Sequence, residues 1–265
     1  MPTVDTLCEP EPLVRRIEER LGRERADVPC SVLGECVRDA WSAFAHARVQ
    51  LYVPVLVERA VRARIGWLAV AGEVPLADVS LRTWAWLTAR HLLAESLPRR
   101  WAHSWGVARR AQQIAPAFSP GDREVLVASA WLHDIGYAAE VAGTGMHQVD
   151  GARYLVGRGV SFRVAALVAH HAGAAAVADL TGMAHALAVF DDEHSPVRDA
   201  LWYCDMTTGP DGHPVTFRER MAELRGRRAA DDPVIRALAV NEDERAAAVR
   251  RTEDLLRHTG LVPAS

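Results

Sequence analysis

The stretch VASAWLHDIGY, residues 127–137, is the part of the sequence that best defines the fold. Its apolar residues up to Leu132 predict a buried helix, and Gly136 is typical of a helix end. His133 and Asp134 stand where this helix ends. Burying an imidazole and a carboxylate costs free energy unless both groups have polar partners. Neighbouring residues on a helix point about 100° apart, so both can reach one metal ion most easily where the helix is ending.

Four further segments place histidine or aspartate on either side of this pair. They contain His103, His147, the pair His170 and His171, and Asp205. Most lie in apolar helical surroundings, near a predicted helix end or a glycine. A transition-metal site in a helical domain needs nitrogen and oxygen ligands that converge from several helices. No thiolate belongs to the set, which therefore suits manganese, iron, zinc, cobalt or magnesium better than a structural zinc.

Each of these residues has a simpler interpretation when it is taken alone. A histidine in LVAHHAG is more often a core or surface histidine than a ligand, and Asp205 can serve as a helix cap. The metal hypothesis rests on the combination, because all five segments occur in one order between His103 and Asp205.

The periodicity of apolar residues predicts an all-α fold. They recur at three- and four-residue spacing along most of the chain, strand-like alternation is nearly absent, and no phosphate-binding glycine loop is present. We expect an N-terminal helical segment over residues 1–75, a main domain over 82–225, and C-terminal helices over 233–265 that pack on it. The N-terminal segment resembles a three-helix unit that packs on the main domain or on a second copy, which makes a homodimer a candidate assembly.

Composition excludes several classes of protein. All 31 basic residues are arginine, so no lysine is present for a Schiff base or a P-loop, and the net charge is −3. The four cysteines form no CxxC pair. The longest membrane-span candidate, residues 164–189, contains three histidines and an aspartate. We expect a cytoplasmic protein without a signal peptide, a membrane partner or a nucleic-acid polymer as partner.

These motifs resemble the HD-domain superfamily of metal-dependent phosphohydrolases, whose pattern is H…HD…D, often with additional histidines. The HDIG context of His133 and the GARYL context after His147 carry the resemblance, which extends over about residues 85–225. It implies an HD-domain helical bundle.

The resemblance also implies roles for the ligands. His103, His133, Asp134 and Asp205 would bind one divalent metal ion. Members with additional histidines bind two ions, for which Asp134 would be the bridge. His147 and one of the pair His170 and His171 would hold the second ion. We favour His170 as that ligand, and name Asp134 and His171 as the catalytic candidates. Manganese, iron, cobalt and zinc are the candidate metals.

A phosphohydrolase also needs cations for its substrate, and in this chain they must be arginine or histidine. Arg110 falls within about 20° of His103 around the helix, whereas Arg109 is about 120° away. Arg153, Thr208 and His213 are further substrate-binding candidates. Each arginine is individually more often a surface cation. The residues after Asp205 form either a substrate loop or a tight connector.

The expected activity is the hydrolysis of a nucleotide or another small phosphate ester by metal-activated water. HHAGAAAVADL replaces the HHExxDGxGYP signature of the enzymes that cut cyclic dinucleotides, which disfavours that activity. The same ligand pattern also fits HD-type diiron oxygenases that act on small polar substrates, and this is the main alternative. A non-catalytic binding module is the third hypothesis, and the complete ligand set argues against it.

Overall fold

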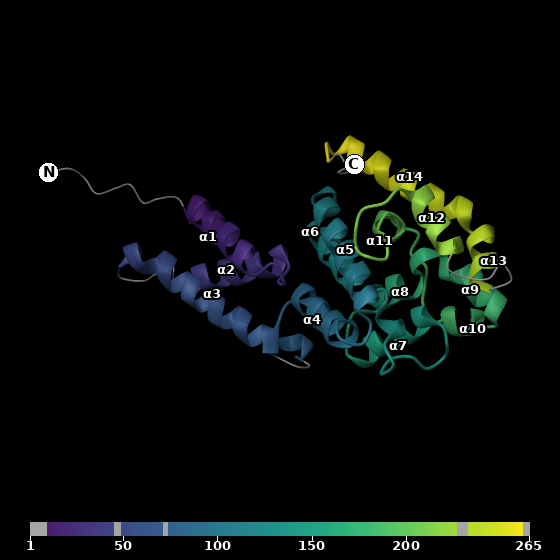
Figure 1. The fold of residues 1–265 in the computed structure, drawn as a ribbon, viewed down its shortest axis with the longest axis horizontal. Coiled ribbons are helices and arrows are strands. Elements are labelled where there is room, and N and C mark those ends of the chain that lie inside the picture. The colour runs from purple at the N-terminus through teal and green to yellow at the C-terminus, as the bar shows by residue number, and fades with distance from the viewer. Residues whose placement is uncertain (1–9, 45–48, 71–73, 227–232, 262–265) are drawn as a thin grey trace. The chain divides into compact units, whose positions relative to one another are not determined.

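The computed structural model of the chain describes residues 10–44, 49–70, 74–226 and 233–261. These residues fold into α-helices joined by turns and short 3₁₀ helices, and this described part contains no β-strand (Figure 1). One isolated antiparallel bridge joins Thr208 to Pro214. The predicted all-α class is therefore confirmed.

The chain divides into two compact units, residues 1–72 and residues 73–265. The first unit contains α1 (Pro10–Glu24), α2 (Cys30–Phe44), η1 (Gln50–Tyr52) and α3 (Val53–Val70). Its three α-helices pack around Leu21, Val32 and Val57, which are fully buried. The finer boundaries suggested by the sequence, at residues 75, 82, 225 and 233, stay predictions.

The second unit contains the remaining elements. In chain order they are η2 (Leu76–Asp78), α4 (Leu81–Leu93), α5 (Pro98–Ile114), η3 (Ala115–Ala117), α6 (Pro120–Leu132), η4 (Ile135–Tyr137), α7 (His147–Gly157), α8 (Phe162–Ala169), η5 (His171–Gly173), α9 (Ala174–Thr181), α10 (Ala184–Leu187), α11 (Pro196–Met206), α12 (Phe217–Gly226), α13 (Pro233–Val240) and α14 (Glu242–His258). Serine caps start α4, α6, α8 and α11: in each, the hydroxyl accepts a hydrogen bond from the amide three residues later.

Helix α6 is the centre of the second unit, because α4, α5, α8 and α11 all pack against it. Every residue from Leu126 to Leu132 is buried. A helix that is apolar on all sides is stable only inside a core. Its C-terminal end, at His133, therefore lies inside the protein and not at its surface.

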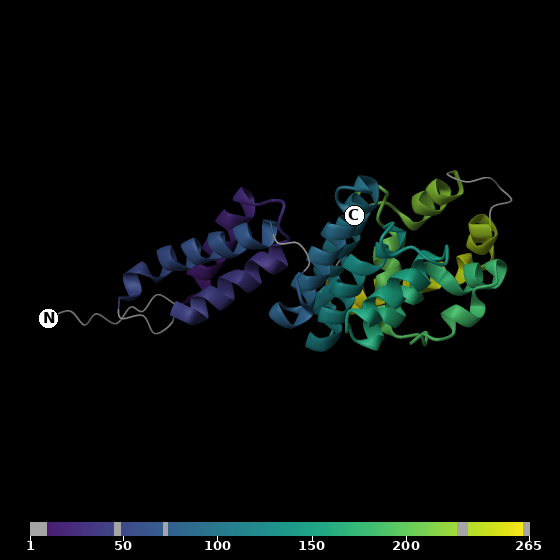
Figure 2. The ribbon, with the colours of Figure 1, turned by 90° about the horizontal axis from the view of Figure 1, so that it is seen from below.

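The neighbouring helices bring distant parts of the chain to the same place. Helix α11, which ends in Asp205 and Met206, packs against α5, α6 and α14. In Figure 1, α14 runs along the outer edge of this unit, and Figure 2 gives the view at right angles. The end of α6, the end of α8, the start of α7 and the end of α11 supply polar side chains to one region of the core.

Among the described residues, one segment is apolar and long enough to cross a membrane by length and composition alone. It spans Phe162–Thr181, and 67% of its most apolar window is buried within the protein. The backbone also breaks inside it, since Ala172 has a φ of 50°. Most of its apolar residues therefore belong to the core of the second unit.

Candidate metal centre

Two groups of histidine and aspartate side chains lie at the buried end of α6. His103, His133 and Asp134 form the first group, and Asp134, His147 and His171 form the second. Within each group the nitrogen and oxygen atoms lie within 4.8 Å of one another. Asp134 belongs to both groups and therefore lies between them.

His103 comes from the middle of α5 and is held from two sides. Its Nδ1 lies 3.0 Å from the carbonyl oxygen of Gly209, and its Nε2 lies 3.0 Å from Oδ1 of Asp205. Gly106 and Gly212 let the loop after α11 approach α5 this closely, because a Cβ on Gly106 would stand 2.4 Å from the carbonyl oxygen of Gly212. The residues after Asp205 thus form a connector that orients His103.

His133 and Asp134 leave α6 at its last turn. The His133 Nδ1 lies 2.8 Å from the carbonyl oxygen of Ala130, one turn back, while its Nε2 is buried without a hydrogen-bond partner. Gly136 then lets α7 begin directly alongside, because a Cβ there would stand 1.9 Å from the carbonyl oxygen of His147. The glycine predicted to end α6 therefore also brings His147 to the site.

His147 and His171 face each other across Asp134. Their Nε2 atoms lie 3.2 Å apart, and they lie 3.5 Å and 3.8 Å respectively from Oδ1 of Asp134. The ring of Tyr137 stacks on His147, with 3.9 Å between ring centroids. The Nδ1 of His171 lies 2.6 Å from the carbonyl oxygen of Val168.

The structure places His171, and not the favoured His170, in the second group. Nε2 of His170 lies 2.6 Å from the carbonyl oxygen of Phe190, outside both groups. Helix α8 ends at Ala169, so the chain turns between the two histidines and directs only the second toward Asp134. Asp150 accepts hydrogen bonds from the amides of Gly143 and Thr144 in the loop before α7.

The electrostatic environment keeps Asp134 and Asp205 charged and favours the neutral imidazoles of His147 and His171. Burial opposes ionisation of Asp134, but Arg100 and the nearby histidines outweigh it and hold the pKa of Asp134 well below its usual range. Burial likewise opposes ionisation of Asp205, and His103 reverses the effect, so the pKa of Asp205 is also lowered. Burial and the facing imidazole of His171 lower the pKa of His147, and burial together with His133 lowers that of His171.

This donor set fits a divalent metal ion. A neutral imidazole that donates from Nδ1 to a carbonyl carries a lone pair on Nε2. Three histidines, His103, His133 and His171, have Nδ1 beside a carbonyl oxygen and Nε2 in the cluster. The Nε2 of His133 is buried without a hydrogen-bond partner, so its lone pair faces the cluster unsatisfied. A cation bound by these atoms accepts that lone pair.

A cavity of about 540 Å³ opens onto both groups. The charged side chains that line it are Arg100, Arg220, Arg245, Asp134 and Asp205, which together carry a net charge of +1 when the histidines are neutral. A divalent ion would make this cavity still more positive. The cavity therefore suits an anionic ligand of small size.

The three arginines differ in how their charge is balanced. Arg100 donates to Oδ2 of Asp134 at 2.9 Å and lies over the ring of Tyr137. Burial opposes its charge, but Asp134 outweighs burial and raises the pKa of Arg100. Arg220 donates to Glu223 at 2.8 Å and lies 3.4 Å from Asp205. Burial lowers the pKa of Arg245 to about 10, so it stays charged at neutral pH.

The substrate-binding residues expected from the sequence do not line this cavity. Arg109, Arg153 and His213 are exposed elsewhere. Arg110 donates to the hydroxyl of Tyr203 at 2.7 Å: it shares a helix face with His103, but seven residues place it about 10 Å further along the axis. The hydroxyl of Thr208 is buried and donates to the carbonyl of Cys204.

Sequence reasoning missed the arginines that do line the cavity. A signal existed for Arg100, which stands three residues before His103 and so lies about 60° from it around α5. Arg220 and Arg245 belong to α12 and α14, outside the histidine motifs, and no spacing in the sequence connects them to the site.

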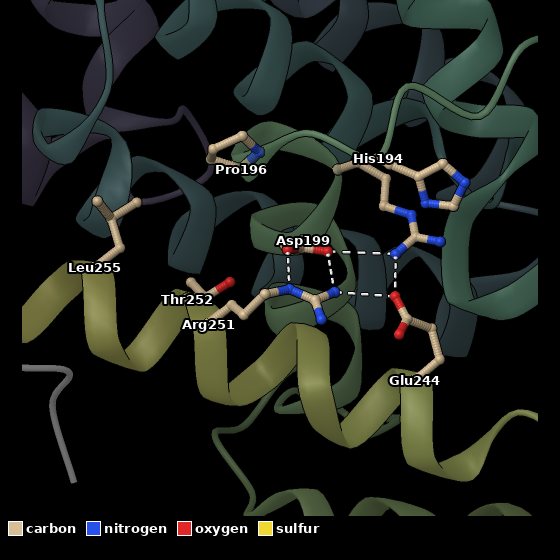
Figure 3. Close-up of a pocket in the computed structure, with 8 residues that line it drawn as sticks. His194, Pro196, Asp199, Glu244, Arg251, Thr252 and Leu255 are labelled. Atoms are coloured by element: carbon tan, nitrogen blue, oxygen red, sulfur yellow. Dashed lines mark hydrogen bonds and ion pairs between the residues drawn. The ribbon is translucent and has the colours of Figure 1, made fainter.

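A second cavity, of about 440 Å³, lies between α11 and α14, and its charges are already paired (Figure 3). Arg251 contacts Asp199 at 2.6 Å and Glu244 at 2.9 Å. Arg198 contacts the same two carboxylates, at 3.3 Å and 2.9 Å. This network needs no ligand to balance its charge.

Comparison with known proteins gives one match. Residues 100–201 match the family described as HD domain. The match begins at Arg100 and includes every residue of the two groups, whereas Asp205 lies just beyond its end. No curated protein and no solved structure matches the chain.

Proposed function

We propose, from the match of residues 100–201 to the HD-domain family, that this protein is a metal-dependent phosphohydrolase acting on a nucleotide or another small phosphate ester. HD domains generally belong to metal-dependent hydrolases that bind divalent ions. The specific reaction and the substrate class are our proposal.

One observation carries the proposal: lone pairs from two sides converge on Asp134, at the wall of a cavity rich in arginine. His103, His133, Asp134 and Asp205 would hold one divalent ion, and Asp134, His147 and His171 a second. Manganese, iron, cobalt and zinc all accept such nitrogen and oxygen ligands. When bound, such ions lower the pKa of a water molecule and polarise a phosphoryl oxygen.

The protein itself fixes the orientation of the metal-binding histidines and supplies positive charge for the substrate. Carbonyl oxygens hold His103, His133 and His171 through Nδ1, which fixes each ring with its Nε2 directed at the cluster. Arg100 places a guanidinium within 2.9 Å of Asp134, beside the position that a phosphoryl group would occupy. A guanidinium matches the geometry of phosphate oxygens with two parallel N–H groups.

A diiron oxygenase with the same ligand set is the alternative, and the deciding experiment is metal analysis combined with product analysis. We expect the purified protein, loaded with manganese, cobalt or zinc, to release phosphate from a panel of nucleotides and sugar phosphates. Two irons per chain together with substrate-dependent consumption of dioxygen, and no phosphate release, would contradict the proposal.

A further inference from the structure

Resting on the proposed function, we propose that Arg245 binds a second anionic group of the substrate, so that the enzyme prefers phosphate esters that carry two anionic groups. The second group is a phosphate or a carboxylate, which a guanidinium recognises with the same bidentate geometry. Arg245 lies on α14, outside the residues that match the HD domain.

Arg245 is buried, but the protein satisfies only some of the N–H donors of its guanidinium. Its side chain lines the cavity, and the residue is 2% exposed. Nε and Nη2 donate to the carbonyl oxygen of Ala172, at 3.0 Å and 2.6 Å, and Nη1 donates to that of Leu238 at 3.3 Å. A guanidinium has five N–H donors, so two remain for a ligand.

The charge of Arg245 has no direct counter-ion among the described residues. Arg100 and Arg220 each contact a carboxylate in the same cavity, whereas the partners of Arg245 are neutral carbonyls. Burying a charge without an ionic partner costs free energy, and a ligand of opposite charge offsets that free energy when it binds. The cavity therefore has two arginines that contact carboxylates of the metal centre and a third, Arg245, that lacks an anion.

Arg245 lies close enough to the metal centre for one substrate to bind at both. Its main partner, Ala172, directly follows His171, which belongs to the metal centre. One phosphate at the metal centre and a second anion at Arg245 would thus be bound across a single cavity of about 540 Å³. This volume fits a small molecule and not a polymer.

The main test compares Arg245→Gln with Arg251→Gln, a matched control on the same helix whose charge is balanced by Asp199 and Glu244 (Figure 3). Substrates are compared in pairs: fructose bisphosphate with fructose monophosphate, and phosphoglycerate with glycerol phosphate. The first pair tests a second phosphate, and the second pair tests a carboxylate.

We expect the wild type to have at least a tenfold higher kcat/KM for the doubly anionic member of at least one pair. The ratio of kcat/KM for the doubly anionic member to that for the singly anionic member should fall to near one in Arg245→Gln, mainly through a change in KM. The same ratio should stay unchanged in Arg251→Gln. A charge-assisted hydrogen bond in a buried site supports an effect of this size. A wild-type enzyme without this preference in either pair, or an Arg245→Gln enzyme that keeps it, overturns the inference.

A binding assay separates this inference from the proposed function. Inorganic pyrophosphate is titrated calorimetrically into the metal-free protein, so the result does not depend on hydrolysis. We expect binding that Arg245→Gln weakens at least tenfold and Arg251→Gln does not. Equal binding by both variants overturns the inference, even if the enzyme is a phosphohydrolase.

Arg245 also holds the turn at Ala172, so its glutamine variant can fail to fold. Hydrogen exchange on the wild type then decides. Pyrophosphate should protect backbone amides of η5 and of the first turns of α14, and the absence of protection in both places overturns the inference.

Discussion

The Nε2 atoms of His147 and His171 lie 3.2 Å apart, with Oδ1 of Asp134 within 3.8 Å of each. His171 turns its Nδ1 to the carbonyl oxygen of Val168, so its Nε2 presents a lone pair to His147. The lowered pKa values of both histidines favour their neutral forms. The lone pair of His171 then accepts a hydrogen bond from Nε2 of a neutral His147, or binds a cation in its place.

Replacing each of the adjacent histidines, His170 and His171, by glutamine should have different effects on metal binding. We expect His171→Gln to weaken binding of the second ion by at least tenfold, because it removes a ligand. His170→Gln should keep metal affinity but lose about 1 kcal/mol of stability, since its contact with Phe190 is weakened. Metal titration and thermal unfolding of both variants check this, and a His170→Gln protein that loses metal would restore His170 as the ligand.

Arg100 and its neighbour Arg99 provide a matched pair for substrate binding. Arg100 donates to Asp134 on the cavity wall, whereas the side chain of Arg99 is 65% exposed. We expect Arg100→Gln to lower kcat/KM for a phosphate ester at least tenfold and Arg99→Gln to change it less than about threefold. Steady-state kinetics check the prediction. Equal effects of the two substitutions would remove Arg100 from the substrate site.

Glycine at position 136 should be essential for the position of α7. A methyl group there would stand 1.9 Å from the carbonyl oxygen of His147. We expect Gly136→Ala to cost about 1–3 kcal/mol of stability and to weaken metal binding, since the start of α7 must shift. Gly157, where an added Cβ would meet no atom within 4 Å, is the control: alanine there should be neutral or slightly stabilising. Denaturant unfolding measures both.

The metal-free protein should lose stability as the pH falls below about 7. The folded protein holds the pKa values of His147 and His171 below the ordinary value of 6.5. The unfolded chain therefore binds more protons at mildly acidic pH, and stability falls from the unfolded pKa down to the folded values. The melting temperature in the presence of a chelator should decrease between about pH 7.5 and pH 5.5. A double variant with glutamine at both positions should show a smaller decrease in melting temperature. An equal decrease in the wild type and the double variant would contradict the assignment of this effect to His147 and His171.

The sequence predicted those parts of the protein that depend on local pattern. Apolar periodicity predicts the helices, and the glycine after Asp134 predicts the end of α6, because both are properties of neighbouring residues. The choice between His170 and His171 depended on the backbone turn after Ala169, and no pattern in HHAG shows its direction. Arg245 reaches the cavity only because α14 packs on α11, a contact between segments distant in sequence.

The most direct test of the metal centre uses Asp134, because it belongs to both ligand groups. The wild type, freed of metal by a chelator, is titrated with manganese or zinc by calorimetry beside Asp134→Asn. Asp211→Asn, whose carboxylate is 71% exposed, is the control. We predict one or two bound ions per chain for the wild type and the control, and a loss of this binding in Asp134→Asn. A wild type that binds no divalent ion, or an Asp134→Asn protein that binds as the wild type does, would contradict the account.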